Sequence, residues 1–181
     1  MTQQIDYAMQ ETWIKAWCYA AQVHGQQKFP GSDMPYLVHL GMVGMEILAA
    51  HAQEPIDGVG TAMQCAILHD AMEDQDIAHA TLAADYGLAV ADGVAALSKS
   101  PSLPKAEAMA DSLRRIRQQP KAVWCVKLAD RISNLQAPPH YWSAEKIGAY
   151  CEEAGVILAA LGEAHGYLAQ RLAAKIAAYP S

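Results

Sequence analysis

A chain of 181 residues with a formal net charge of −6 and a mean hydropathy near zero is long enough to bury the core of one domain. Lysine and arginine form no run longer than Arg114-Arg115, which argues against non-specific binding to nucleic acid. No apolar stretch approaches the roughly 18 residues that span a membrane, and the opening MTQQIDYAMQET does not have the pattern of a secretory signal.

The apolar residues of the first half are spaced as in helices. Between Trp13 and His24 they recur at i, i+3, i+4 and i+7, which predicts an amphipathic helix. The segment QQKFPGSDMP interrupts this pattern with proline and glycine, and a second helix is expected from about Pro35 to about His51. After the loop EPIDGVG, the segment TAMQCAILHDAMED, residues 61–74, is predicted to be one helix.

The second half continues the helical pattern. Helices are expected over 88–98, 105–119 and 121–136, with Pro120 separating the last two. A long C-terminal helix is expected from near Ser143 through Leu172, the last of its regularly spaced apolar residues. Because no strand, repeat or linker stands out, we predict an all-α fold in which residues 1–181 form a single helical bundle domain.

The cysteines bear on the cellular compartment. Cys18, Cys65, Cys125 and Cys151 lie far apart in apolar surroundings and form no Cys-x-x-Cys pair. We expect buried free thiols in a reducing, cytoplasmic environment, with disulfides as the alternative.

Four side chains suited to metal binding occur in the strings YLVHL, AILHDAMED and VKLADRISNL: His39, His69, Asp70 and Asp130. Two imidazoles and two carboxylates suit a divalent first-row metal of intermediate hardness, and they leave positions open for water and substrate. The oxygen donors favour manganese or magnesium, whereas the imidazoles also admit iron or zinc. Such an ion can lower the pKa of a bound water to near neutrality, so the sequence predicts a site for hydrolytic chemistry.

A second acidic pair, Glu73-Asp74, follows four residues after His69-Asp70. Residues at i and i+4 are neighbours on a helix, so these polar groups are expected to lie close together. Several carboxylates at one place repel unless a counter-charge is present, and a dication supplies one. The alternative is a solvated acidic helix end.

The segment KLADRISN places Lys127, Asp130, Arg131 and Asn134 on one helix face. The simpler interpretation is an exposed face with a Lys-Asp ion pair that contributes little stability. The functional interpretation assigns Asp130 to the metal and Asn134 to a substrate hydroxyl or phosphate.

Taken together, these strings resemble the HD-domain hydrolases and, within them, the RelA/SpoT-type small alarmone hydrolases, a group that includes the metazoan SpoT homologue. The motifs that carry the resemblance are H-x-Q-Q at 24–27, P-Y-x-x-H at 35–39, L-H-D-x-x-E-D at 68–74, K-L-A-D-R-x-x-N-L at 127–135, and Trp142 followed eight residues later by Tyr150.

The resemblance implies a helical HD fold, one manganese ion, and removal of the 3′-pyrophosphate from a hyperphosphorylated nucleotide. It implies that His39, His69, Asp70 and Asp130 are the metal ligands. It further implies that Glu73 and Asp74 surround the attacking water, and that Asn134 and Tyr150 hold the nucleotide sugar.

One departure from the family concerns the base. Guanine-specific members carry a strongly basic stretch after H-x-Q-Q, whereas this chain has Lys28-Phe29-Pro30 with a single cation. Lys28 is also a candidate phosphate contact, as a point charge. We therefore expect a small-molecule nucleotide substrate of the (p)ppGpp or (p)ppApp class. Alternatives are a phosphatase acting on NADPH or nucleoside monophosphates, and a non-catalytic alarmone-binding module.

Overall fold

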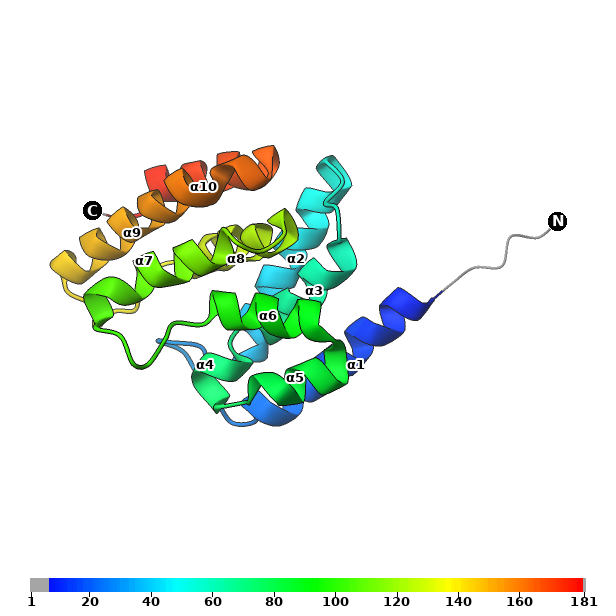
Figure 1. Cartoon of the computed structure of the whole chain (residues 1–181). Helices are drawn as coiled ribbons and strands as arrows, with labels where there is room; N and C mark the ends of the chain where they lie inside the picture. Colours follow the sequence, from blue (N-terminus) through cyan, green and yellow to red (C-terminus); the bar gives the residue numbers. More distant parts are fainter. Residues whose placement is uncertain (1–6, 181) are drawn as a thin grey trace.

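The computed structural model describes residues 7–180, apart from the side chain of Lys105. This part of the chain folds into α-helices and one 3₁₀ helix (Figure 1). Their bounds are α1 (Ala8–His24), α2 (Leu37–Gln53), α3 (Val59–Leu68), α4 (Ala71–Gln75), α5 (His79–Tyr86), α6 (Leu88–Leu97), α7 (Lys105–Ile116), α8 (Lys121–Asn134), α9 (Ala144–Leu161), η1 (Gly162–Ala164) and α10 (Gly166–Ala178). Over residues 7–180 there is no strand, only an isolated bridge between Lys28 and Pro35. The predicted all-α class is confirmed.

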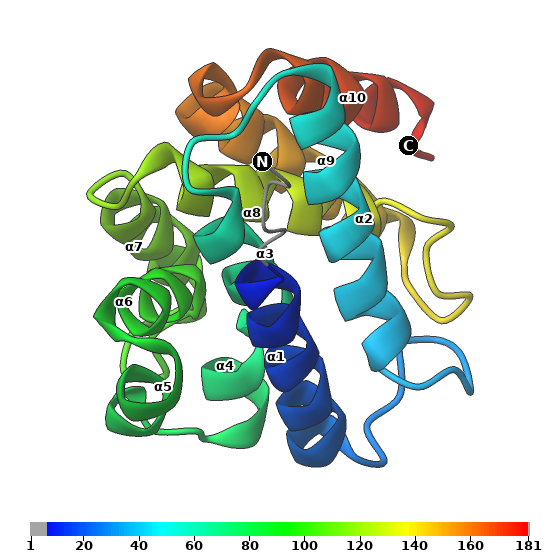
Figure 2. The ribbon, with the colours of Figure 1, turned by 90° about the vertical axis from the view of Figure 1, so that its right-hand side faces the viewer.

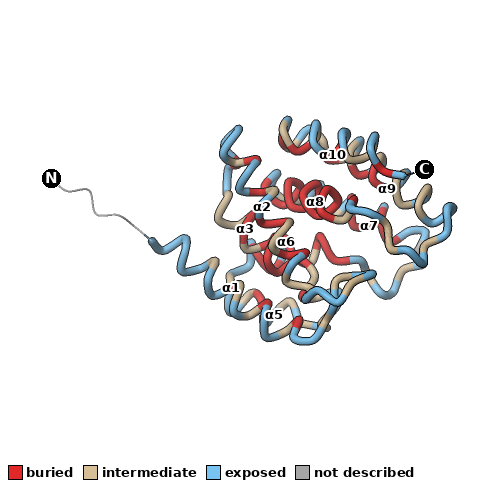
Figure 3. Tube along the Cα trace, turned by 180° about the vertical axis from the view of Figure 1, so that it is seen from behind, coloured by how far each residue is buried: buried red, intermediate tan, exposed pale blue. Residues whose placement is uncertain are grey.

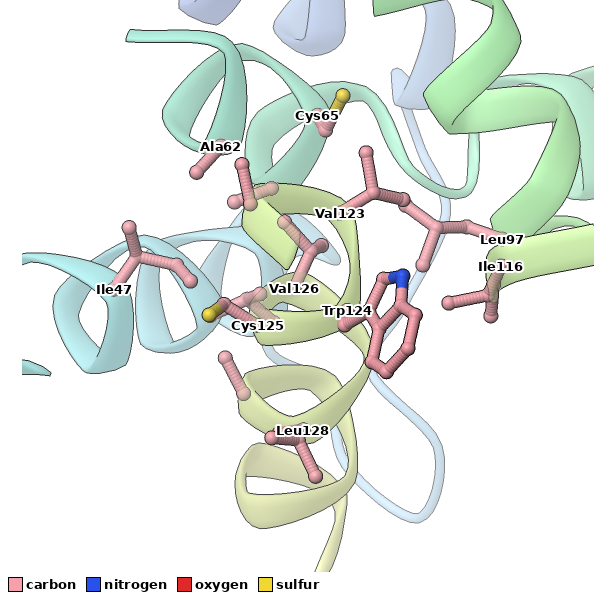
Figure 4. Packing of buried hydrophobic residues seen from close by; sticks show 14 of the residues in the cluster. Ile47, Ala62, Cys65, Leu97, Ile116, Val123, Trp124, Cys125, Val126 and Leu128 are labelled. Atoms are coloured by element: carbon pink, nitrogen blue, oxygen red, sulfur yellow. The ribbon is translucent and has the colours of Figure 1, made fainter. Parts of the chain in front are cut away.

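Helix α8 runs through the centre of the molecule. Residues 122–133 are all buried, and Figure 3 shows this helix as a red run among paler surface helices. It packs against α2, α3, α9 and α10, and Figure 4 shows Trp124 of α8 beside Ile116 of α7. A helix buried on every side is ordinarily apolar on every side. Because α8 also buries Lys127, Asp130 and Arg131, these polar groups need partners inside the protein.

The prediction of one helix over residues 61–74 is wrong in one respect, because the helix is interrupted at His69 and Asp70. Helix α3 ends at Leu68, and the short helix α4 begins at Ala71 with Asp70 as its N-cap residue. The ring Nδ1 of His69 donates to the Ala66 carbonyl at 2.9 Å. In an uninterrupted helix that carbonyl would accept the amide of Asp70, so the side chain competes with the helical bond.

The prediction of a single long C-terminal helix is also wrong, because this segment forms two helices. Helices α9 and α10 pack against each other and run in opposite directions across one face of the molecule (Figure 1). The turn contains His165 in an extended conformation, with its Nε2 2.9 Å from the carbonyl oxygen of Glu54. Helix α5, of eight residues, was not predicted at all.

Two loops lie side by side at the edge seen on the right of Figure 2: residues 25–36, after α1, and residues 135–143, after α8. They touch at Gly31, where an added Cβ would lie 3.0 Å from Pro139 Cβ. Within the first loop the Tyr36 amide donates to the Gln27 carbonyl at 2.9 Å. This bond folds the loop back, so that the end of α1 and the start of α2 lie near the α3–α4 junction.

None of the helices within residues 7–180 combines the length and the apolar character needed to cross a membrane. The four cysteines are free thiols. Cys65 and Cys125 are buried as predicted, but Cys151 is only half-buried and Cys18, on α1, is exposed.

Candidate metal centre

The side chains of His39, His69, Asp70 and Asp130 converge from three parts of the fold. His39 is the third residue of α2, His69 and Asp70 form the α3–α4 junction, and Asp130 belongs to α8. The Nε2 atoms of His39 and His69 lie 3.3 Å apart. His39 Nε2 is 3.6 Å from Asp70 Oδ2 and 3.4 Å from Asp130 Oδ1.

The same carboxylates also approach the second histidine. His69 Nε2 lies 2.8 Å from Asp70 Oδ2 and 3.7 Å from Asp130 Oδ1. Among residues 7–180, His39, His69 and Asp70 form a group whose donor atoms all lie within 4.8 Å of one another, and Asp130 adjoins this group through the two histidines. Neighbouring atoms bound to one octahedral ion at roughly 2.1 Å stand about 3 Å apart. The spacing of these donor atoms therefore fits one shared divalent ion.

The protonation of the histidines fits an ion as well. Because His69 Nδ1 carries the proton that bonds Ala66, the neutral form of the ring presents the lone pair of Nε2 to the cluster. This is the usual way in which a second hydrogen bond fixes the tautomer of a metal-binding histidine. Two imidazole nitrogens that face each other at 3.3 Å share at most one proton between them, whereas a cation accepts both lone pairs.

The charges at this place call for a cation. Burial raises the pKa of Asp130, but the charge of Lys127 and hydrogen bonds to both histidines outweigh it and hold that pKa well below its usual value. The pKa of Asp70 falls to about 2, because the charge and hydrogen bond of His69 outweigh burial. Burial lowers the pKa of His69, but the charge of Asp70 and hydrogen bonds to Asp130 and Asp70 raise it well above its usual value. Without a metal ion, a protonated His69 together with Lys127 balances the two carboxylates.

Three further side chains orient the carboxylates. Lys127 Nζ donates to Asp130 Oδ2 at 2.9 Å, and Asn134 Nδ2 donates to Asp130 Oδ1 at 2.6 Å. Tyr36 Oη donates to Asp70 Oδ2 at 2.5 Å. Burial, and then the negative charge of Asp70, raise the pKa of Tyr36, so it stays a donor. Sequence reasoning gave Tyr36 no role, although its place three residues before His39 was a usable signal.

The two members of the second acidic pair face different surroundings. Asp74 Oδ2 accepts a hydrogen bond from Gln27 Nε2 at 2.7 Å, and the charge of Asp74 reaches Tyr36. Glu73 Oε2 instead accepts the backbone N–H of Lys99 at 2.7 Å. Glu73 and Lys99 line a cavity of about 710 Å³ between α4, α6 and α7.

The residues expected to bind substrate lie at different depths. Lys28 is exposed on the loop of residues 25–36, and Asn134 is half-buried next to Asp130. The half-buried ring of Tyr150 lies under the guanidinium of Arg131, with its centroid 4.1 Å from Cζ. The structure thus brings Asn134 into direct contact with Asp130 of the candidate metal centre, whereas Tyr150 is linked to it through Arg131, the residue that follows Asp130.

Comparison with known proteins finds similarity to an HD-domain family and to 3′-pyrophosphohydrolases. The family model described as HD domain matches residues 16–168. The guanosine-3′,5′-bis(diphosphate) 3′-pyrophosphohydrolase MESH1 of Danio rerio is 29% identical over 159 residues, which cover 85% of this chain and 86% of the relative. MESH1 of Homo sapiens is 28% identical over 153 residues, 82% and 83% of the two chains. A solved structure of a metazoan orthologue of SpoT, described as hydrolysing ppGpp, has a TM-score of 0.82 at 24% identity and 97% coverage of both chains.

Proposed function

The chain belongs to the HD-domain family, and from this premise we propose that it is a metal-dependent 3′-pyrophosphohydrolase of hyperphosphorylated purine nucleotides. Its relatives are named for that reaction on guanosine 3′,5′-bis(diphosphate). The observation that carries the proposal is the convergence of two imidazole nitrogens, 3.3 Å apart, each of which lies 2.8 to 3.7 Å from an oxygen of Asp70 and an oxygen of Asp130, with Asp74 held four residues beyond Asp70.

In this proposal His39, His69, Asp70 and Asp130 hold one divalent ion, with manganese as the expected metal. When bound, that ion supplies Lewis-acid activation of a water and of the phosphoryl group. Its charge also offsets the repulsion between the phosphates and the carboxylates of the site.

The acidic pair supplies proton transfer. In the proposed reaction the water oxygen bonds to the phosphorus next to the sugar, the bond from that phosphorus to the 3′ oxygen breaks, and pyrophosphate leaves. Asp74 orients the water and takes its proton, and Glu73 assists from the side of the cavity. The 3′ oxygen gains a proton and becomes a hydroxyl. General acid–base help of this kind contributes roughly 10²- to 10⁴-fold.

Three residues are proposed to hold the nucleotide. Asn134 donates through Nδ2 to Asp130, and its carbonyl oxygen can accept a sugar hydroxyl. Tyr150 provides an aromatic wall for the sugar, and its cation–π contact with Arg131 fixes the ring. Lys28, exposed on the loop of residues 25–36, is the proposed cation for the phosphates.

The test is a comparison of products. Purified protein with and without added manganese is incubated with the 3′-pyrophosphorylated guanosine and adenosine nucleotides, with NADPH and with nucleoside monophosphates, and the released species are resolved by ³¹P NMR. Metal-dependent release of pyrophosphate supports the proposal. Release of orthophosphate from NADPH or monophosphates would support the phosphatase alternative. Binding of the nucleotide without any product would support a non-catalytic module.

A further inference from the structure

We infer that Gln27, held by His24 and Gln75, is a positioning residue that fixes the Asp74 carboxylate for proton transfer; this inference rests on the proposed function. Gln27 Nε2 donates to Asp74 Oδ2 at 2.7 Å. The other end of the same amide, Oε1, lies 2.7 Å from His24 Nδ1 and accepts a hydrogen bond from Gln75 Nε2 at 2.6 Å. One amide therefore joins the end of α1 to the short helix α4.

The direction of each bond follows from Asp74. An ionised carboxylate accepts hydrogen bonds and cannot donate them, so Gln27 must turn its NH₂ group toward Asp74. Its carbonyl oxygen then faces His24 and Gln75, and both of these must donate. The proton of His24 accordingly sits on Nδ1. The amide of Gln27 cannot flip, because a flip would oppose two oxygens at Asp74 and two N–H groups at Gln75.

The donor side of this network is held rigidly. His24 is buried, with 3% of its surface exposed, and its ring stacks on that of Tyr36 with the centroids 5.1 Å apart. Tyr36 in turn bonds Asp70. The same pair of stacked rings therefore braces both carboxylates, Asp70 directly and Asp74 through Gln27.

The consequence for catalysis concerns the second oxygen of Asp74. Because Oδ2 is engaged by Gln27, the orientation of the carboxylate is restricted, and Oδ1 is left as the oxygen that takes the proton from the reacting water in the proposed reaction. Asp74 itself is exposed, and an exposed carboxylate without such a bond samples several rotamers. A misplacement of about 1 Å at a reacting group can cost on the order of 100-fold in rate.

The experiment is a double-mutant cycle on kcat, measured with the manganese-loaded protein and the pyrophosphorylated nucleotide that it hydrolyses best. Gln27→Ala should lower kcat about 10- to 100-fold, with metal content and KM within a factor of three of wild type. In the Asp74→Ala background the same change should alter kcat by less than threefold, because there is no carboxylate left to orient. Gln26→Ala, an exposed neighbour, is the matched control and should leave kcat unchanged.

A second pair of variants keeps the inference testable if Gln27→Ala folds poorly. His24→Asn retains an N–H donor toward Gln27, and His24→Leu retains only packing volume. Asn should preserve most of the rate, and Leu should lower it to the level of Gln27→Ala. An equal loss for Gln27→Ala in both backgrounds, or equal rates for His24→Asn and His24→Leu, would show a merely structural role. A wild-type protein with no turnover would instead overturn the proposed function.

Discussion

Tyr36 and Asp70 are joined by a 2.5 Å hydrogen bond from the phenol to Oδ2, the same oxygen that lies 3.6 Å from His39 Nε2 and 2.8 Å from His69 Nε2. The bond ties the start of α2 to the α3–α4 junction, 34 residues away. It occupies one lone pair of the carboxylate and leaves the other directed at the centre of the cluster. Tyr36 thereby sets the direction from which Asp70 can bind an ion.

Tyr36→Phe should weaken metal binding without altering the ring packing. The ring stacks on His24 and lies 5.3 Å from that of His39, and phenylalanine keeps those contacts. Loss of a bond to a metal-binding carboxylate typically costs 10- to 100-fold in affinity, and we expect a Kd for manganese raised by that factor. Isothermal titration of both proteins measures it. An unchanged Kd would mean that the phenol does not support the ligand.

Asp130→Asn should abolish turnover and the stabilisation that manganese gives. Asparagine keeps the shape of the side chain but removes the charge that faces Lys127 and the two histidines. An ion at 100 times its Kd stabilises the folded state by about 2.7 kcal/mol, and the variant should lose that increment. The measurements are the melting temperature with and without manganese and the number of metal ions bound per chain. The wild-type protein should bind one ion per chain.

The matched control for Asp130→Asn is Asp92→Asn. Asp92 is a carboxylate residue on α6 that is about half exposed and pairs with His79 at 2.7 Å. It should retain the metal, the activity and the manganese-dependent rise in melting temperature. If Asp130→Asn also retains them, Asp130 is not a ligand.

Glu73→Gln and Asp74→Asn should lower kcat while the metal stays bound. Each change keeps the size of the side chain and removes the proton acceptor. We expect losses on the order of 10²- to 10⁴-fold, larger for Asp74, because Glu73 is bonded to the backbone of Lys99. Steady-state kinetics and metal analysis on the same samples make the comparison. Loss of metal with unchanged substrate affinity would identify these residues as ligands.

The side-chain pairs that helical spacing predicted and the hydrogen bonds that it missed differ in the number of residues between the partners. Lys127, Asp130 and Asn134 are three or four residues apart on α8, so helical spacing alone placed them on one face, and the structure joins all three. The bonds from Tyr36 to Asp70 and from Gln27 to Asp74 span 34 and 47 residues. No local period encodes such pairs.

The wrong helix boundaries have a similar cause. At His69 the side chain bonds the Ala66 carbonyl, and at His165 the ring contacts the Glu54 carbonyl, 111 residues away. Both histidines lie in segments with helical apolar spacing, and at both breaks the histidine ring contacts a backbone carbonyl. A pattern of apolar residues carries no information about such bonds.

The buried thiols predict how stability depends on pH. Burial raises the pKa of the Cys65 thiol to about 12. It is also the main cause that raises the pKa of the Cys125 thiol to about 12. Between the unfolded pKa and that value the unfolded chain releases protons that the folded chain keeps, so stability is lost as pH rises. Each thiol contributes a slope of about 1.4 kcal/mol per pH unit. Urea unfolding at pH 8.5 to 10 measures how the free energy of unfolding falls with pH. Cys125→Ala should make this fall smaller by the contribution of one thiol. An identical fall in the variant would contradict this origin.

The last prediction concerns the base. Guanine offers an O6 acceptor with N1 and N2 donors, whereas adenine offers an N6 donor and ring-nitrogen acceptors. A cation-rich loop favours the O6 edge and can also stack on the ring. In this chain Lys28 is the single cation of the loop segment Lys28-Phe29-Pro30, and the Phe29 ring packs toward His39, with centroids 6.1 Å apart. We therefore expect weak discrimination between the two bases, with kcat/KM for the guanosine compound less than about 100 times that for the adenosine compound, or about 2.7 kcal/mol.

A variant that adds one positive charge to the loop tests this prediction further. Pro30 is exposed, so Pro30→Arg places a second cation in the loop and should shift the ratio of kcat/KM values toward guanosine, whereas Pro30→Ala controls for the lost proline and should not. The two nucleotides are compared in competition, so that the ratio is independent of the active fraction of enzyme. A wild-type preference for guanosine above 100-fold, or a ratio that Pro30→Arg leaves unchanged, would mean that the cations of this loop do not read the base. Faster turnover of NADPH than of either compound would instead favour the phosphatase.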